Sequence, residues 1–438
     1  MGLTSSSSRS SPGRGLSSTL GVAAFPSGEV YRVDDPEPTV IVGRLFLRQV
    51  IGLGGGMVPI ASGPNQLAGE RDRDALTLTV GKVATTDFVD SNPVSSDPHA
   101  GFMSWGLWAS AAYDYPADTR GYTYGFAADL TRDFWSIRAG VFCEPKSANG
   151  MELELDLRKA RGVVAEGEAR YQVGELPGAA RALLFRNTAD MGSYEEALAE
   201  SPTNPGVTNT RAQGRTKTGF AASANQDLGQ GLAAFLRLSY NDGRTESWAF
   251  TEIDRSVAGG LVQSGWRWGR SDDRVGLGLV VSGLSAPHRN YLAAGGYGFI
   301  IGDGRLNYAL EVLAEAYYML AVTREVSAGV NYQAIFNPAY NRDRGPVQVL
   351  TGRVHVAFQE PDALGPRPLA RPGVRPRARQ GYHGPDAGPS PRCAPSRPVR
   401  LRGGSGGNHW LPLALELPPG AARGGGRARG GGPLRPRV

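Results

Sequence analysis

The chain has 438 residues, of which 40% are hydrophobic and 20% are charged, with a formal net charge of +6. Its two cysteines, Cys143 and Cys393, are too few for a disulfide scaffold or a four-cysteine zinc site. With 16 Tyr, 14 Phe and 7 Trp, most of the chain is too rich in packing residues for wholesale disorder. No run of 18 uncharged apolar residues occurs, which excludes a membrane-spanning helix.

The N-terminal segment, residues 1–38, is rich in serine, with Ser5 to Ser8 consecutive. It lacks the basic region and apolar core of a secretory signal. We expect this segment to be disordered or mis-translated.

From residue 39 to residue 358 the hydrophobic pattern has a period of two. Between Val163 and Val173, for example, Glu166, Glu168 and Arg170 alternate with Ala and Gly. This alternation predicts strands with one apolar and one polar face. The expected strands, about fourteen in number, lie near 39–51, 74–83, 104–115, 121–131, 133–143, 162–173, 179–188, 216–226, 231–241, 256–269, 273–284, 307–320, 324–336 and 347–358.

The length of these strands favours a membrane barrel over a soluble sheet. Most span roughly twice the 5–6 residues that are average for soluble proteins, and their connections include both short turns and long loops. We therefore predict an all-β, transmembrane antiparallel β-barrel over residues 39–358, with disordered termini. A soluble β-sandwich with one wet face, or a solenoid, is the alternative. The aromatic girdles at the two membrane interfaces are expected to include Trp105, Tyr113, Tyr122, Tyr240, Trp266, Trp268, Tyr308 and Tyr318.

The positive charge is concentrated in residues 359–438. This segment contains 14 Arg, no Lys and four acidic residues, whereas the rest of the chain has 33 basic and 37 acidic residues. Because Arg, Pro and Gly dominate it, we expect a disordered tail. Its RGGGRARGGG stretch at 423–432 is similar to RNA-binding tracts, but GC-rich DNA translated out of frame has the same composition, and no nucleic acid is expected as a partner.

Several segments of the middle region resemble the carbohydrate-selective porin family. They are RLFLRQVIGLGG at 44–55, LTLTVGKVATTDFVD at 76–90, YDYPADTRGYTYG at 113–125 and NPAYNRDRGPV at 337–347. The resemblance covers about residues 39–358. It implies a sixteen-strand barrel in the bacterial outer membrane through which sugars diffuse passively, with no chemical step. In the family an aromatic residue near the end of the barrel is the assembly signal, which here would be Phe358.

For such a porin, the working residues are the charged side chains that face the lumen. Mixed guanidinium and carboxylate groups present hydrogen-bond donors and acceptors to sugar hydroxyls, although they also brace a lumen through cross-strand pairs. The alternation predicts that these pore-lining residues are Lys82, Arg138, Glu166, Glu168, Arg170, Arg237, Glu311, Glu315 and Arg353, with His355 beside them.

Other functions find less support in the residues. An enzyme would need an acid–base or nucleophile cluster, and we find none, so we expect no enzyme activity and no cofactor. Asp254, Asp272, Asp273 and Asp303 could supply oxygen ligands to calcium, but loop carboxylates at Gly-rich turns are usually solvated, and we expect no metal. The expected partners are sugar solutes, outer-membrane lipid and further copies of the chain. The alternatives are an outer-membrane barrel with another role, a truncated non-functional product, and RNA binding through the tail.

Overall fold

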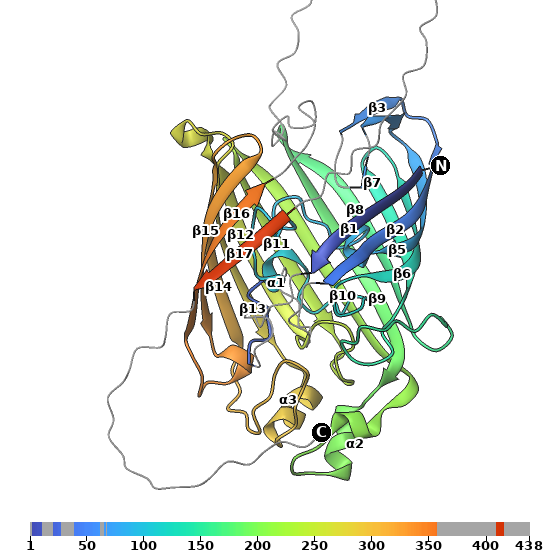
Figure 1. Ribbon diagram of the computed structural model, residues 1–438, viewed down its shortest axis with the longest axis vertical. Coiled ribbons are helices and arrows are strands. Elements are labelled where there is room, and N and C mark those ends of the chain that lie inside the picture. The colour runs from blue at the N-terminus through green and yellow to red at the C-terminus, as the bar shows by residue number, and fades with distance from the viewer. Residues whose placement is uncertain are drawn as a thin grey trace, which may run out of the picture.

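The computed structural model of the protein describes residues 2–10, 21–27, 39–61, 65–66, 68–356 and 409–415. Fifteen strands form one antiparallel sheet that curls into a barrel (Figure 1). In sheet order they are β1 (Gly2–Ser10), β2 (Thr39–Gly52), β5 (Ala75–Val83), β6 (Thr123–Thr131), β7 (Trp135–Cys143), β8 (Arg161–Val173), β9 (Leu176–Met191), β10 (Ala212–Gly229), β11 (Leu232–Asn241), β12 (Arg255–Ser264), β13 (Arg274–Gly283), β14 (Glu311–Ala321), β15 (Val326–Phe336), β16 (Val347–Val356) and β17 (His409–Leu415).

The connections differ in length at the two ends of the barrel. One end has tight turns, such as the turn from β10 to β11, where Gln230 and Gly231 both have positive φ. The other end has long loops, which contain the helices α2 (Tyr194–Glu200) and α3 (Ala286–Ala293). One long connection, between β2 and β5, also lies at the tight-turn end, and it contains the hairpin β3 (Met57–Ile60) and β4 (Gly69–Asp72). In an outer-membrane barrel the tight turns face the periplasm and the long loops face outward.

Four 3-10 helices and one further α-helix complete the described secondary structure. They are η2 (Thr85–Asp87), α1 (Trp105–Trp108), η3 (Val207–Thr210), η4 (Gly265–Trp268) and η5 (Pro338–Tyr340). Within the described ranges, no helix is long and apolar enough to span a membrane.

The two faces of the wall have opposite character, as the alternation predicted. On β11, Leu236 and Leu238 are 48% and 40% exposed, whereas Arg237 between them is 1% exposed. The same pattern on β8 leaves Val163 outside and Glu166 inside. Apolar side chains outside and polar side chains inside are the reverse of a soluble protein and suit a wall that contacts lipid.

The predicted strands are confirmed except at residues 104–115. That segment contains α1 and lies inside the barrel, where Trp105, Leu107 and Tyr113 are all buried. Its alternating aromatic residues therefore do not mark a strand. A strand of the wall would have exposed one face to lipid, but this segment is buried on all sides.

The N-terminal region is partly ordered. Strand β1 pairs with β2, and residues 21–27 lie inside the barrel, with Ala23, Ala24 and Phe25 buried (Figure 1). The prediction of disorder is thus wrong for these residues. They were missed because so short an apolar stretch has no recognisable period. Strand β17 pairs with β16, whereas Phe358, stretch 423–432 and the remaining tail lie outside the described residues.

Candidate solute path through the barrel

An inner loop, residues 84–122, folds from the wall into the lumen and fills much of it. Arg237 on β11 is its main anchor: the guanidinium donates to Asp90 Oδ1 at 2.6 Å, to Ser96 Oγ at 2.6 Å and to the Trp108 carbonyl at 2.9 Å. Asp90 in turn accepts hydrogen bonds from the amide and hydroxyl of Ser110. One buried ion pair thus ties three parts of the inner loop to the wall.

Strands β14 and β16 hold the inner loop through its backbone. On β14, the Glu315 carboxylate accepts hydrogen bonds from the amides of Met103 and Ser104 at 2.6 and 2.9 Å. On β16, Arg353 donates to the carbonyls of Pro98 and Gly101. These contacts hold residues 98–104 across the lumen.

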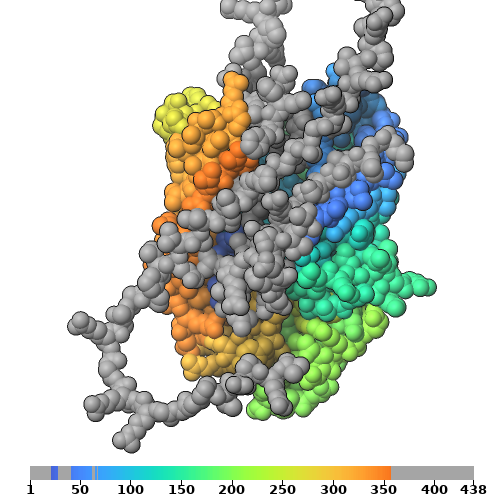
Figure 2. All heavy atoms as spheres, in the orientation of Figure 1, coloured from blue at the N-terminus to red at the C-terminus, as the bar shows by residue number. Residues whose placement is uncertain are grey.

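Glu311, four residues before Glu315 on β14, holds the N-terminal segment. Its carboxylate accepts hydrogen bonds from the amides of Ala23, Ala24 and Ala339 at 2.7–2.9 Å. Gln333 on β15 donates to the Pro26 carbonyl. Figure 2 shows the strand walls on the two sides of the molecule, blue to green and orange.

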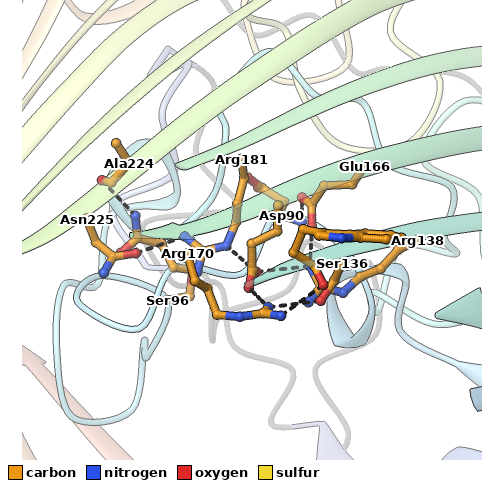
Figure 3. A network of polar contacts seen from close by, with 12 residues as sticks. Asp90, Ser96, Ser136, Arg138, Glu166, Arg170, Arg181, Ala224 and Asn225 are labelled. Carbon is orange, nitrogen blue, oxygen red and sulfur yellow. Dashed lines mark hydrogen bonds and ion pairs between the residues drawn. The ribbon is translucent and has the colours of Figure 1, made fainter. Parts of the chain in front are cut away.

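Charged side chains from neighbouring strands meet at the tight-turn end of the lumen, in a group that we call the vestibule network. Arg138 Nη1 lies 2.9 Å from Glu166 Oε1 and 3.1 Å from Glu168 Oε2, and Arg181 Nε lies 2.9 Å from the same Glu168 oxygen (Figure 3). Arg170 Nη1 also pairs with Glu168. Three guanidinium groups therefore surround one carboxylate, and each charge is partly compensated.

The vestibule network borders a cavity of about 660 Å³. Glu168, Arg170 and Arg181 line it together with Asn225 and Asp227 from β10, and Pro93 and Val94 of the inner loop also border it. The side chain of Arg170 is 33% exposed, against 9% for Glu168 and 8% for Arg181. Arg170 is thus the more accessible of the two arginines that line this cavity.

Of the nine predicted pore-lining residues, four are in the vestibule network, namely Arg138, Glu166, Glu168 and Arg170. Four more face inward but are occupied in holding the inner loop or residues 21–27: Arg237, Glu311, Glu315 and Arg353.

The inward position predicted for Lys82 is wrong. On β5, Thr79 and Val83 are buried, so the alternation places Lys82 on the outward face with Val80, which is 50% exposed. Its Nζ lies 5.9 Å from the centre of the Tyr124 ring on the neighbouring strand. The prediction assumed that a charge must face the lumen, but near a strand end an outward cation reaches the headgroup level of the membrane.

Sequence reasoning missed several residues that line the cavity or hold the inner loop. Arg181 lies in a predicted strand and alternates with the outward Ala180 and Ala182, so the period-two pattern could have found it. Asp90 lies in the inner loop, where no period exists, and nothing in the sequence marks its pairing with Arg237.

A second buried cluster lies near the long-loop end. Asp114 Oδ1 and Oδ2 accept hydrogen bonds from the amides of Trp248, Ala249 and Phe250, at 2.7–3.0 Å, and Lys217 Nζ lies 3.7 Å from Oδ2. Glu144 is fully buried, and neither of its oxygens has a described partner. Burial, with a contribution from Asp114, raises the pKa of Glu144 well above its usual range, although Lys217 opposes the shift.

The candidate calcium carboxylates do not converge. Asp254 pairs with His288, Asp273 with Arg270, and Asp303 with Arg344. No group of three or more His, Cys, Asp or Glu able to hold a metal ion occurs among the described residues.

The predicted girdle is partly wrong as well. Trp105, Tyr113 and Tyr122 are buried in the interior, whereas Trp266 and Tyr240 are 59% and 45% exposed near strand ends. The three buried rings belong to the inner loop, whose position the sequence pattern did not reveal.

A sheet of long strands with an apolar exterior and a charged interior defines the chain as an outer-membrane β-barrel channel. The chain belongs to the carbohydrate-selective porin, OprB family, whose family model matches residues 9–358. The match begins before residue 39 and so includes residues 21–27. None of the curated proteins matches the chain.

One solved structure agrees with this fold. The structure of Pseudomonas putida OprB at high pH is 16% identical, with a TM-score of 0.60 and 80% of each chain covered. The low-pH structure of the same protein has a TM-score of 0.37 at 16% identity and covers 69% of this chain and 64% of its own. The outer membrane channel DcaP of Acinetobacter baumannii has a TM-score of 0.36 at 10% identity and covers 72% of this chain and 87% of its own.

Proposed function

We propose that glucose-like sugars diffuse through this porin along the cavity lined by the vestibule network. The observation that carries the proposal is the arrangement of Arg170, Glu168 and Arg181 along an open cavity at the tight-turn end. A neutral sugar carries hydroxyl groups that both donate and accept hydrogen bonds. Alternating guanidinium and carboxylate groups offer both kinds of partner, with little net charge to attract ions.

The chain needs no chemical step for this function, and we propose that it is not an enzyme. Residues that hold the inner loop shape the path without contacting the solute. Arg170, Asn225 and Asp227 are the residues that we expect the solute to contact. We also predict that several copies of the chain assemble and that the chain has no nucleic-acid partner.

Liposome swelling tests the proposed path. The full chain is reconstituted, and swelling rates in glucose and in the smaller solute glycerol are compared for R170Q and the wild type. Losing one hydrogen bond of about 0.5–1.5 kcal/mol should change the glucose-to-glycerol ratio roughly two- to tenfold.

K82Q is the matched control, because it removes a cation that faces outward. It should leave the ratio unchanged. If R170Q and K82Q both behave as the wild type in correctly folded barrels, the solute does not pass along the vestibule network.

A further inference from the structure

Two arginines lie on the outward face of the barrel wall near the long-loop end. On β9, Arg186 alternates with the buried Phe185 and shares its face with Leu184, which is 67% exposed. On β12, Arg255 is exposed and shares its face with Val257, which is 52% exposed. Both guanidinium groups therefore lie on the lipid-facing side of the wall.

Strand register places these arginines at the edge of the apolar band. Arg186 lies opposite Val163 of β8 on one side and opposite Thr218 of β10 on the other. Arg255 is the first residue of β12 and lies opposite Tyr240. The next outward side chains toward the tight-turn end are apolar, namely Leu184 after Arg186 and Val257 after Arg255. A long arginine side chain at this height can place its charge among lipid headgroups.

A third arginine lies beside Arg186. Arg161 begins β8 and lies opposite Thr188, so it is a diagonal neighbour of Arg186 on the same face. Its Nη1 donates to the Leu157 carbonyl at 2.9 Å. The other N–H groups of this guanidinium remain as donors for a further partner.

Arg186 and Arg255 lack the partners that other arginines at this end have. Arg211 pairs with Glu246, and Arg215 pairs with Glu196. Among the described residues, the side chains of Arg186 and Arg255 make no ion pair and no hydrogen bond. An unpaired charge beside hydrocarbon is unfavourable, so an anionic partner from outside the chain would stabilise it.

We propose that the outward face at the long-loop ends of β8 to β12 binds the phosphate-bearing headgroup of an outer-leaflet lipid. Arg161 and Arg186 form one cationic pair, and Arg255 extends the surface past Tyr240. Guanidinium groups bind phosphate through paired N–H donors. A lipid is favoured over free phosphate because Leu184 and Val163 continue the site as an apolar surface for acyl chains.

Native mass spectrometry of the full chain in detergent tests this site, with phosphatidylglycerol and phosphatidylcholine as probes. The wild type should retain phosphatidylglycerol preferentially. The double variant R186Q/R255Q should retain roughly tenfold less, because it loses two charge-assisted contacts to phosphate. R186K/R255K keeps the charges and should retain an intermediate amount.

R274Q is the matched control, because Arg274 is an exposed arginine at the tight-turn end. It should retain phosphatidylglycerol as the wild type does, and heat-modifiable migration shows that each variant is folded. Equal retention of the two lipids by the wild type, or equal retention of phosphatidylglycerol by the wild type and R186Q/R255Q, would overturn the proposal. Displacement of phosphatidylglycerol by inorganic phosphate alone would assign the site to the free anion and also overturn it.

Discussion

The ion pair between Arg237 and Asp90 controls how firmly the inner loop stays in the lumen. Both side chains are buried, at 1% and 3% exposure, and their atoms lie 2.6 Å apart. Replacing Arg237 with Met leaves the Asp90 carboxylate buried without its cation. Breaking a buried pair in this way costs about 3–5 kcal/mol.

If this cost falls on the inner loop alone, displaced conformations become about 10² to 10⁴ times more populated. We expect R237M to admit larger sugars, which liposome swelling with a trisaccharide measures, and to raise the single-channel conductance in planar bilayers. Removing both charges in D90N/R237M should restore part of the wild-type exclusion, because no buried charge then lacks a partner.

K82M is the control for R237M, since it makes the same kind of change on the outward face. The reasoning is refuted if R237M folds, yet excludes the trisaccharide and conducts as the wild type does. That result would mean that the backbone contacts of Glu315 and Arg353 hold the inner loop without help from Arg237.

Three further changes test the long-loop end, with stability read from the temperature at which the folded band is lost on a gel. E144Q should raise this temperature above about pH 4.5, where ionisation of the buried Glu144 favours unfolding, and the gain should vanish below that pH; a less stable variant at pH 7 would reveal a hidden partner. G162A should destabilise, because its Cβ would lie 2.0 Å from Pro116 Cγ, whereas G167A, with nothing within 4 Å, should not; equal effects would contradict this. D114A should cost about 3 kcal/mol by leaving backbone amides unpaired, and unchanged stability would show that water replaces the carboxylate.

Much of the wall could be predicted from the sequence because lipid and lumen impose opposite demands on alternate residues. Arg237 between Leu236 and Leu238 shows this directly, since each face has a single solvent. The interior could not be predicted in the same way. Trp105 and Tyr113 are surrounded on all sides, so their alternation carries no information about a face.

The sequence predicted a set of charged side chains that face inward. It did not predict which of them line the cavity and which hold the inner loop. Glu168 and Glu315 look alike in the sequence, each an acidic residue between small outward ones. Their roles differ because Glu168 meets arginines from adjacent strands, whereas Glu315 meets backbone amides of a segment more than two hundred residues away. Contacts between residues so far apart in the sequence depend on the path of the inner loop, and the sequence of that loop has no hydrophobic period that would predict its path.

Several carboxylates inside the barrel bind main-chain amides rather than side chains. Glu315 holds Met103 and Ser104 in this way, Glu311 holds Ala23 and Ala24, and Asp114 holds the turn that begins at Trp248. An amide is present whichever side chain a residue carries, proline excepted. The segments that narrow the bore can therefore exchange their side chains during evolution, or in a redesign for another solute, while their course through the barrel is kept.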